Sequence, residues 1–273
     1  MARLDWGDPE RPVDLVFLHA TGFNALTYRS LLEPLADRFH VAAPDLRGHG
    51  QTALPTDSAR HSSWNTYATD VIALLETLDR PVVLAGHSMG ATASLLVAAR
   101  APERVSSVVL LDPVILSRRQ AAAMRLPGFW RLAGRHPWAQ AALKRRDRFP
   151  DTETAFRAYH GRGSFKGWPD ETLRDYVEGG FRPTPEGDVA LACAPDWEAA
   201  NYGAQANDSW GALKRLSRPA RILKAGRGST CAVTPEDAAR YPDVCVQSVE
   251  GGTHFFPMTQ QDVARAALIE ALG

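Results

Sequence analysis

The chain has 273 residues, of which 45% are hydrophobic and 23% charged, with 31 basic and 31 acidic side chains. These values are typical of a globular protein, and the length suits one large α/β domain or a domain with one sizeable insertion. A formal charge of zero gives no support to a nucleic-acid partner or a membrane surface.

The N-terminal segment and the cysteines bear on where the protein works. The first 22 residues contain no apolar core of a signal peptide, and no uncharged stretch reaches the roughly 18 residues that a membrane-spanning helix needs. Cys193, Cys231 and Cys245 are odd in number and lack metal-ligand spacing. We therefore expect a cytoplasmic protein without a metal site, and we expect Cys245 to be a buried thiol in an apolar strand.

Short apolar stretches alternate with helical patterns along the chain. Six stretches predict buried strands, over residues 14–20, 40–45, 81–87, 107–112, 220–226 and 244–250. They are apolar nearly throughout, which is typical of a parallel sheet covered on both faces. Apolar residues at helical spacing predict helices over residues 66–79, 89–102 and 262–272. The order predicts an α/β fold, with a mostly parallel central sheet flanked by helices.

This alternation breaks between residue 114 and about residue 210. The stretch holds 13 of the chain's 23 aromatic residues, and no strand–helix unit is recognisable in it. A segment of this length is too long for a loop. We therefore predict a core formed by residues 1–114 and 211–273, with residues 115–210 inserted as a helical cap over the C-terminal edge of the sheet.

The strongest motif is the sequence AGHSMGA at residues 85–91, which fits the pattern Gly-x-Ser-x-Gly. A predicted strand precedes it and an alanine-rich helix follows it, as a nucleophile elbow requires. A chance glycine-rich loop would not need these flanking elements. Ser88 is therefore the predicted nucleophile, and the backbone N–H of Met89 is a predicted oxyanion donor.

Four segments, LHATGF, PDLRGHGQT, GHSMG and GGTHFFPM, resemble those of α/β-hydrolase-fold serine hydrolases with a helical cap. The resemblance implies that the backbone N–H of Thr21 is the second oxyanion donor and that His19, Asp45 and Arg47 are structural. It also implies that His254, after the last strand, is the general base. Imidazole suits that role because it titrates near neutrality.

The triad acid is not in the family's commonest position, which falls at Ser229 in this chain. A serine cannot supply a negative charge, and the next acids, Glu236 and Asp237, are typical of the first turn of a helix. In a minority of the family, including zearalenone-type lactone hydrolases, the acid follows the strand after the nucleophile helix. That position is Asp112, so we predict its carboxylate within about 3.2 Å of His254 Nδ1.

The aromatic residues of the cap favour an apolar or aromatic substrate, and Phe23, Trp197 and Phe255 are predicted to lie in the pocket. Residues 115–150 contain nine basic side chains and one acid, which favours a basic surface docked near an acidic one over a gate for anionic substrates.

The predicted function is hydrolysis of carboxylic esters or lactones through an acyl-serine intermediate, without a cofactor, in a monomer or homodimer. Two alternatives stay open. One is hydrolysis of a carbon–carbon bond in ring-cleavage products. The other is a ligand receptor that kept the pocket and lost turnover.

Overall fold

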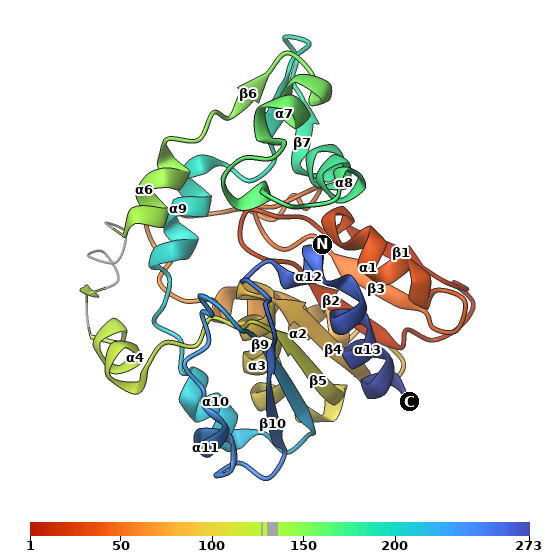
Figure 1. Ribbon diagram of the computed structural model, residues 1–273, viewed down its shortest axis with the longest axis vertical. Coiled ribbons are helices and arrows are strands. Elements are labelled where there is room, and N and C mark those ends of the chain that lie inside the picture. The colour runs from red at the N-terminus through yellow and green to blue at the C-terminus, as the bar shows by residue number, and fades with distance from the viewer. Residues whose placement is uncertain (127, 130–135) are drawn as a thin grey trace.

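A computed structural model describes residues 1–126, 128–129 and 136–273 of the chain. A sheet of seven strands in the order β1-β3-β2-β4-β5-β9-β10 forms its centre (Figure 1). The strands are β1 Arg3–Trp6, β2 Leu15–Leu18, β3 Val41–Pro44, β4 Val82–His87, β5 Val105–Leu111, β9 Ala220–Ala225 and β10 Val244–Val249. The pair β1–β3 is antiparallel and the other pairs are parallel, which confirms the predicted α/β class.

Helices cover both faces of this sheet. On one face α2 (Asn65–Leu75) and α10 (Ser209–Arg215) pack against α3 (Met89–Arg100). The other face is covered by α1 (Arg29–Leu32) and α13 (Gln261–Leu272). Alternate residues of each central strand enter one of the two apolar layers, because successive side chains of a strand point to opposite faces. The buried residues of the central strands are therefore mainly apolar on both faces of the sheet.

The six predicted strands are present, and two features of the sheet's edges differ from the prediction. The edge strand β1 was not predicted because its four residues are largely exposed and include two charged side chains. The expectation that Cys245 is buried is wrong, because β10 is the opposite edge strand and Cys245 is exposed on it. A strand at the edge of a sheet has a neighbouring strand on one side only, so its side chains can be more exposed to solvent than those of a central strand.

Between β5 and β9 the chain leaves the sheet, and residues 115–210, the inserted segment, lie mostly above the core in Figure 1. The segment contains α4 Arg118–Met124, α6 Pro137–Leu143, α7 Thr152–Tyr159, η4 Gly163–Phe165, α8 Asp170–Gly180 and α9 Pro195–Gly203. It also contains a small antiparallel sheet of β6 Arg148–Phe149, β8 Val189–Leu191 and β7 Phe181–Pro183. Strands of two or three residues are too short to leave a pattern in the sequence.

The remaining elements are short and lie at the ends of the central strands and helices. They are η1 Leu26–Tyr28, η2 Glu33–Leu35, η3 Pro102–Arg104, α11 Pro235–Ala238 and α12 Phe256–Thr259. The helix α8 of the inserted segment rests on η1 of the core. Since α10 begins at Ser209 and packs on α3, this helix crosses the boundary predicted at residue 211. The division into core and cap stays a prediction.

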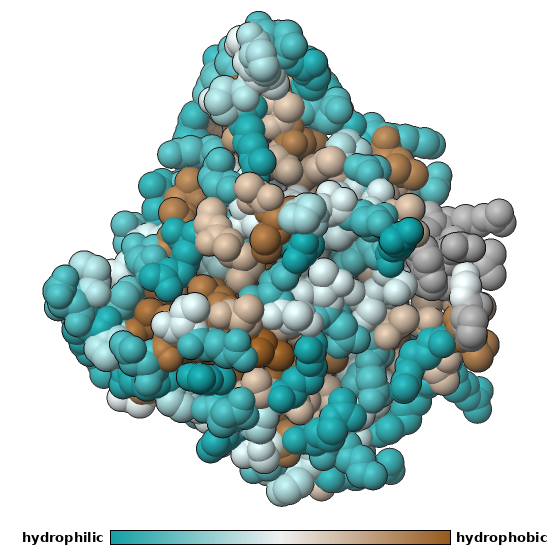
Figure 2. Space-filling model, turned by 180° about the vertical axis from the view of Figure 1, so that it is seen from behind, coloured by the Kyte–Doolittle hydropathy of each residue, from teal (hydrophilic) through white to brown (hydrophobic). Residues whose placement is uncertain are grey.

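The surface is mixed in character. On the face shown in Figure 2, apolar side chains form small groups among hydrophilic ones. Within the described ranges, no helix has the length and apolar character needed to cross a membrane.

Candidate active site

Ser88 stands at a sharp turn between β4 and α3. Its backbone has φ 56° and ψ −118°, a region that residues with a side chain rarely adopt. The turn requires glycine on both sides: a Cβ on Gly86 would lie 2.6 Å from the carbonyl carbon of Gly90, and a Cβ on Gly90 would lie 2.2 Å from the carbonyl oxygen of Leu18. The motif therefore folds as the predicted elbow, with the serine at the start of a helix.

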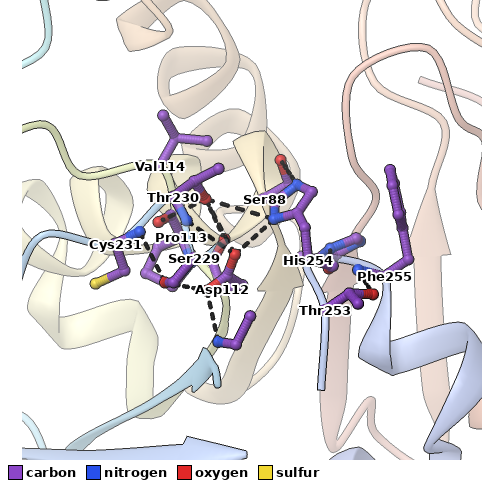
Figure 3. Close-up of polar contacts among 12 residues, drawn as sticks. Ser88, Asp112, Pro113, Val114, Ser229, Thr230, Cys231, Thr253, His254 and Phe255 are labelled. Atoms are coloured by element: carbon purple, nitrogen blue, oxygen red, sulfur yellow. Dashed lines mark hydrogen bonds and ion pairs between the residues drawn. The ribbon is translucent and has the colours of Figure 1, made fainter. Parts of the chain in front are cut away.

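His254 and Asp112 lie in line with this serine (Figure 3). The Nε2 atom of His254 is 3.0 Å from Ser88 Oγ, and its Nδ1 atom is 2.6 Å from Asp112 Oδ2. The second distance confirms the geometry predicted for Asp112 and His254. Because a carboxylate only accepts hydrogen bonds, Nδ1 carries the proton and Nε2 is free to accept one from the serine.

The carboxylate of Asp112 is fully buried and receives several hydrogen bonds besides that of His254. Oδ1 accepts from Ala225 N at 2.8 Å and Ser229 Oγ at 2.5 Å, and Oδ2 accepts from Thr230 N at 3.1 Å. Burial alone would raise the pKa of Asp112, but the hydrogen bond and charge of His254 and the donors Ser229 and Ala225 lower it to about 2. This carboxylate is therefore ionised at neutral pH.

Ser229 occupies the position where most of the family has the triad acid, and it contacts Asp112, the acid predicted to act instead. Its hydroxyl donates to Asp112 and accepts a hydrogen bond from Cys231 N at 3.1 Å. The segment after β9 thus supplies hydrogen-bond donors to a carboxylate that comes from the end of β5. The sequence identified the missing charge but not this supporting role of the serine.

The two predicted oxyanion donors lie on separate elements. Met89 is the first residue of α3, so its N–H has no acceptor within the helix. Thr21 lies in the loop after β2, and in the described part of the chain its N–H makes no hydrogen bond. The Thr21 hydroxyl donates to Met89 Sδ at 3.1 Å, and Thr21 lines the same cavity as Ser88, the residue that precedes Met89.

Buried polar groups hold the loop that carries Thr21. Nε2 of His49 accepts from Gly22 N at 3.0 Å, and Oδ1 of Asp45 accepts from Ala25 N at 2.8 Å. Nε2 of His19 accepts from Leu46 N at 2.9 Å. Burial lowers the pKa of His19 to about 4 and that of His49 to about 3, so both rings can accept at neutral pH.

A further chain of hydrogen bonds, not predicted from the sequence, joins this loop to His254. Ala20 N donates to the Tyr28 hydroxyl at 3.1 Å, and that hydroxyl lies 2.8 Å from Nδ1 of His87. Nε2 of His87 is 2.8 Å from the carbonyl oxygen of His254, so this nitrogen carries the proton. Burial, together with the charge of His254, lowers the pKa of His87 to about 3. The one feature of the sequence that could have indicated this role is that His87 directly precedes the predicted nucleophile Ser88.

A cavity of about 670 Å³ opens above Ser88 and His254. Thr21, Phe23 and Phe255 line it from the core, as the sequence predicts for the two phenylalanines. Most of the rest of the wall comes from the inserted segment, and includes Leu116, Met124, Trp138, Arg145, Tyr159, Arg162, Phe165, Tyr176, Glu198 and Tyr202. Aromatic and aliphatic side chains predominate, with a few charged groups among them.

Trp197, the third predicted pocket residue, is not among the residues that line this cavity. Its indole nitrogen donates to the carbonyl oxygen of Arg47 at 3.1 Å, and its ring lies 4.4 Å from that of His61. The side chain is buried between the inserted segment and the core. The expectation for Trp197 is therefore corrected: this tryptophan joins two parts of the fold.

Four of the seven described basic side chains of residues 115–150 are paired with acids from later in the chain. The ion pairs with their shortest distances are Arg118–Asp237 at 3.3 Å, Arg125–Asp208 at 3.1 Å, Arg145–Glu198 at 2.5 Å and Arg148–Glu186 at 2.7 Å. Arg131 and Arg135, and the aromatic Trp130, lie outside the described residues. These pairs favour the interpretation that a basic surface docks on an acidic one.

Among the described residues, no cluster of three or more histidine, cysteine or acidic side chains has the arrangement of a metal site.

Comparison with known proteins gives consistent matches. The family model described as the alpha/beta hydrolase family matches residues 15–267. A 2-(acetamidomethylene)succinate hydrolase from Mesorhizobium japonicum is 26% identical over 259 residues, which cover 93% of this chain and 86% of that protein. A mouse monoglyceride lipase is 32% identical over 125 residues, 43% of this chain and 41% of the lipase. The crystal structure of an E-2-(acetamidomethylene)succinate hydrolase, 24% identical, has a TM-score of 0.80 and covers 99% of this chain and 94% of its own.

Proposed function

The chain belongs to the alpha/beta hydrolase family, and on that premise we propose that it is a serine hydrolase that cleaves carboxylic esters or lactones of apolar or aromatic substrates. The observation that carries this proposal is the line from Ser88 Oγ through His254 to Asp112, with distances of 3.0 and 2.6 Å. Nucleophile, base and orienting carboxylate stand in the order that acyl transfer needs.

The proposed reaction follows from the donors and acceptors of this site. Ser88 Oγ attacks the carbonyl carbon of the substrate while His254 Nε2 takes the hydroxyl proton, and the amides of Thr21 and Met89 stabilise the oxyanion. His254 then gives that proton to the leaving alcohol, which leaves an acyl-Ser88. Water, deprotonated by His254, attacks the acyl group, and the acid is released as the bond to Ser88 Oγ breaks and His254 returns the proton to that oxygen. Asp112, kept ionised, stabilises the imidazolium at both steps.

The cavity supports an apolar or aromatic acyl or alcohol group. Next to the reacting serine, the rings of Phe23 and Phe255 stack with centroids 6.2 Å apart. A volume of about 670 Å³ is within the usual range for sites that take a small organic molecule. The cytoplasmic location expected from the sequence, and a monomer or homodimer, stay part of this proposal.

A second candidate comes from the relative that matches almost the full length of the chain. The named substrate of that hydrolase carries an acetamido group and two carboxylates. Hydrolysis of an amide in a related compound would use the same acyl-serine chemistry. The ester proposal is preferred because the wall of the cavity is mainly apolar and Glu198 already neutralises Arg145.

An active-site phosphonate and a substrate panel test both candidates. We expect the phosphonate to label Ser88 in the native protein and not in Ser88→Ala, and we expect turnover of aryl esters or lactones to be lost in that variant. The panel also includes an acetamido amide and a diketone, the latter for carbon–carbon hydrolysis. Labelling without turnover of any compound would favour the receptor alternative. Failure to label Ser88, with no cleavage of an activated ester, would overturn the proposal.

A further inference from the structure

Arg145 is a nearly buried cation in the wall of the cavity, on the inserted segment. Its Nη1 atom makes an ion pair with Glu198 Oε2 at 2.5 Å. Its Nη2 atom donates to the hydroxyl of Tyr176 at 2.6 Å and to that of Tyr159 at 3.3 Å. Burial by itself would lower the pKa of Arg145, but the neighbouring Tyr176 and Glu198 hold it well above its ordinary value. The guanidinium is therefore permanently charged and is neutralised within the protein.

The direction of these hydrogen bonds leaves two donors without acceptors. A guanidinium can only donate, so both tyrosine oxygens accept from Arg145, and each keeps its own O–H proton to donate. Within the described ranges no protein group accepts either proton, and both tyrosines line the cavity. Burial raises the pKa of Tyr176 well above its ordinary value, so its proton is retained at any working pH.

Beside Tyr176 lies a third donor that has no acceptor. Trp168 packs against Tyr176 and Phe23, with ring centroids 6.2 and 5.4 Å away, and its indole N–H has no partner among the described residues. Phe23 in turn lies 5.5 Å from the ring of Tyr176, which links this wall to the loop beside Ser88. A buried donor without an acceptor costs free energy, so a bound molecule that supplies an acceptor gains by pairing with it.

We propose that Tyr159 and Tyr176, oriented by Arg145, form a recognition subsite for an uncharged oxygen acceptor of the substrate, such as a ketone or amide carbonyl remote from the scissile bond. This inference rests on the proposed function only in taking the cavity as the substrate site.

The charge balance decides between a neutral acceptor and a carboxylate. Arg145 and Glu198 together carry no net charge, so a carboxylate buried beside them would lose its hydration without gaining a counter-charge. The carboxylate of Glu198 would also repel it. Arg162 is a second cation in the cavity wall, but it is exposed, and solvent screens its charge. The subsite therefore selects a dipolar group.

The test uses para-nitrophenyl octanoate, its keto isomers with the ketone moved along the acyl chain, and para-nitrophenyl hydrogen suberate. Dissociation constants are measured by calorimetry in Ser88→Ala, where esters bind without being cleaved. We expect one keto isomer to bind about three- to tenfold more tightly than octanoate, since each phenol contributes one neutral hydrogen bond. Tyr159→Phe and Tyr176→Phe, each added to Ser88→Ala, should each reduce this preference about threefold.

Tyr67→Phe, added to Ser88→Ala in the same way, is the control: the hydroxyl of Tyr67 is buried against Asn201 Oδ1 at 2.7 Å and Tyr67 does not line the cavity, so its loss should leave the preference unchanged. The inference is overturned if no keto isomer is preferred, if the preference survives both tyrosine substitutions, or if it falls equally in the control. Tighter binding of the suberate ester would overturn the choice of an uncharged group. Turnover by the native protein is a separate readout: a keto preference in binding without cleavage of any ester would count against the hydrolase alone.

Discussion

Asp112 receives more hydrogen bonds than it needs to orient one imidazole, and this feature defines its role at the scale of single residues. The donors come from β9, from the loop after it and from His254, and they occupy both carboxylate oxygens. Its backbone adopts φ 40°, a conformation that costs about 1–3 kcal/mol in a residue with a side chain. A buried, strained residue with this many partners is fitted to carry a negative charge.

Replacement of Asp112 by asparagine should therefore be severe. An amide nitrogen cannot accept the hydrogen bonds that the second carboxylate oxygen receives, and without the negative charge the imidazolium is no longer stabilised. We expect kcat of Asp112→Asn to fall by about 10²–10⁴, measured with an aryl ester. Glu236→Gln is the control, since Glu236 is an exposed acid of the first turn of α11, and it should lose little. Nearly full activity in Asp112→Asn would show that the acid is located wrongly.

At this scale the sequence predicted which residues meet as the proposed triad, but it did not predict the hydrogen bonds that hold them. The positions of Ser88 and His254 could be predicted from the order of strands and helices. Asp112 was predicted because the family's commonest acid position holds Ser229, which is not an acid. The hydrogen bond from Ser229 to Asp112 could not be predicted, because it depends on how the loops after two neighbouring strands meet. Trp197 was misplaced for the same reason, since the position of α9 over the core is a tertiary property.

At the scale of elements, three loops converge on the site, and one hydrogen-bond chain connects them. The chain runs from Ala20 N–H after β2, through Tyr28 in η1 and His87 at the end of β4, to the carbonyl oxygen of His254. Tyr28 and His87 are almost completely buried, so water does not compete for these bonds. The chain ties the loop that carries Thr21, the proposed oxyanion donor, to the loop that carries His254, the proposed base.

Tyr28→Phe should loosen both loops. It leaves Ala20 N–H and His87 Nδ1 without partners, which costs about 1–3 kcal/mol in the free energy of unfolding. We also expect kcat to fall by about tenfold with KM little changed, because a misplaced oxyanion donor weakens transition-state binding most. Unfolding in urea and steady-state kinetics measure the two effects.

Tyr67→Phe is the control for this prediction. The hydroxyl of Tyr67 is equally buried and donates to Asn201 Oδ1 at 2.7 Å, but Tyr67 does not line the cavity. It should lose comparable stability and keep kcat. An equal loss of kcat in the two variants would mean that Tyr28 supports the fold only.

The elements themselves were predictable where they are long and apolar. Each central strand carries apolar residues on both faces, and α2, α3 and α13 bury one side, so their spacing is visible in the sequence. The short strands β1, β6, β7 and β8 are visible only after folding, since pairing with a neighbour defines them. The aromatic content of residues 115–210 predicted an apolar cavity wall, but the pairing of Arg145 with Glu198 and two tyrosines required the structure.

At the scale of the whole molecule, the protein buries four histidines in their neutral form. Burial lowers the pKa of His19 and His61 to about 4 and that of His49 and His87 to about 3, from an ordinary value of 6.5. All four make hydrogen bonds in or near the loops of the site. Stability and the integrity of the site should therefore depend on pH together.

The sign of that dependence follows from proton counting. Between about pH 4 and pH 6.5 the unfolded chain protonates these histidines and the native protein does not, so the unfolded state binds more protons and stability falls as the pH decreases. Asp175 acts in the opposite direction, because burial raises its pKa to about 6 and the native protein binds its proton first. Four groups outweigh one, so the net effect is destabilisation by acid.

We expect the free energy of unfolding to be nearly constant above about pH 7.5 and to fall with a slope approaching 1.4 kcal/mol per pH unit for each buried histidine below about pH 6. Urea unfolding at a series of pH values measures the slope. Asp175→Asn should steepen it below about pH 6, because the opposing group is then absent, and this variant separates the two contributions. A free energy that stays flat down to about pH 5, or rises, would contradict the assignment of these histidines as neutral.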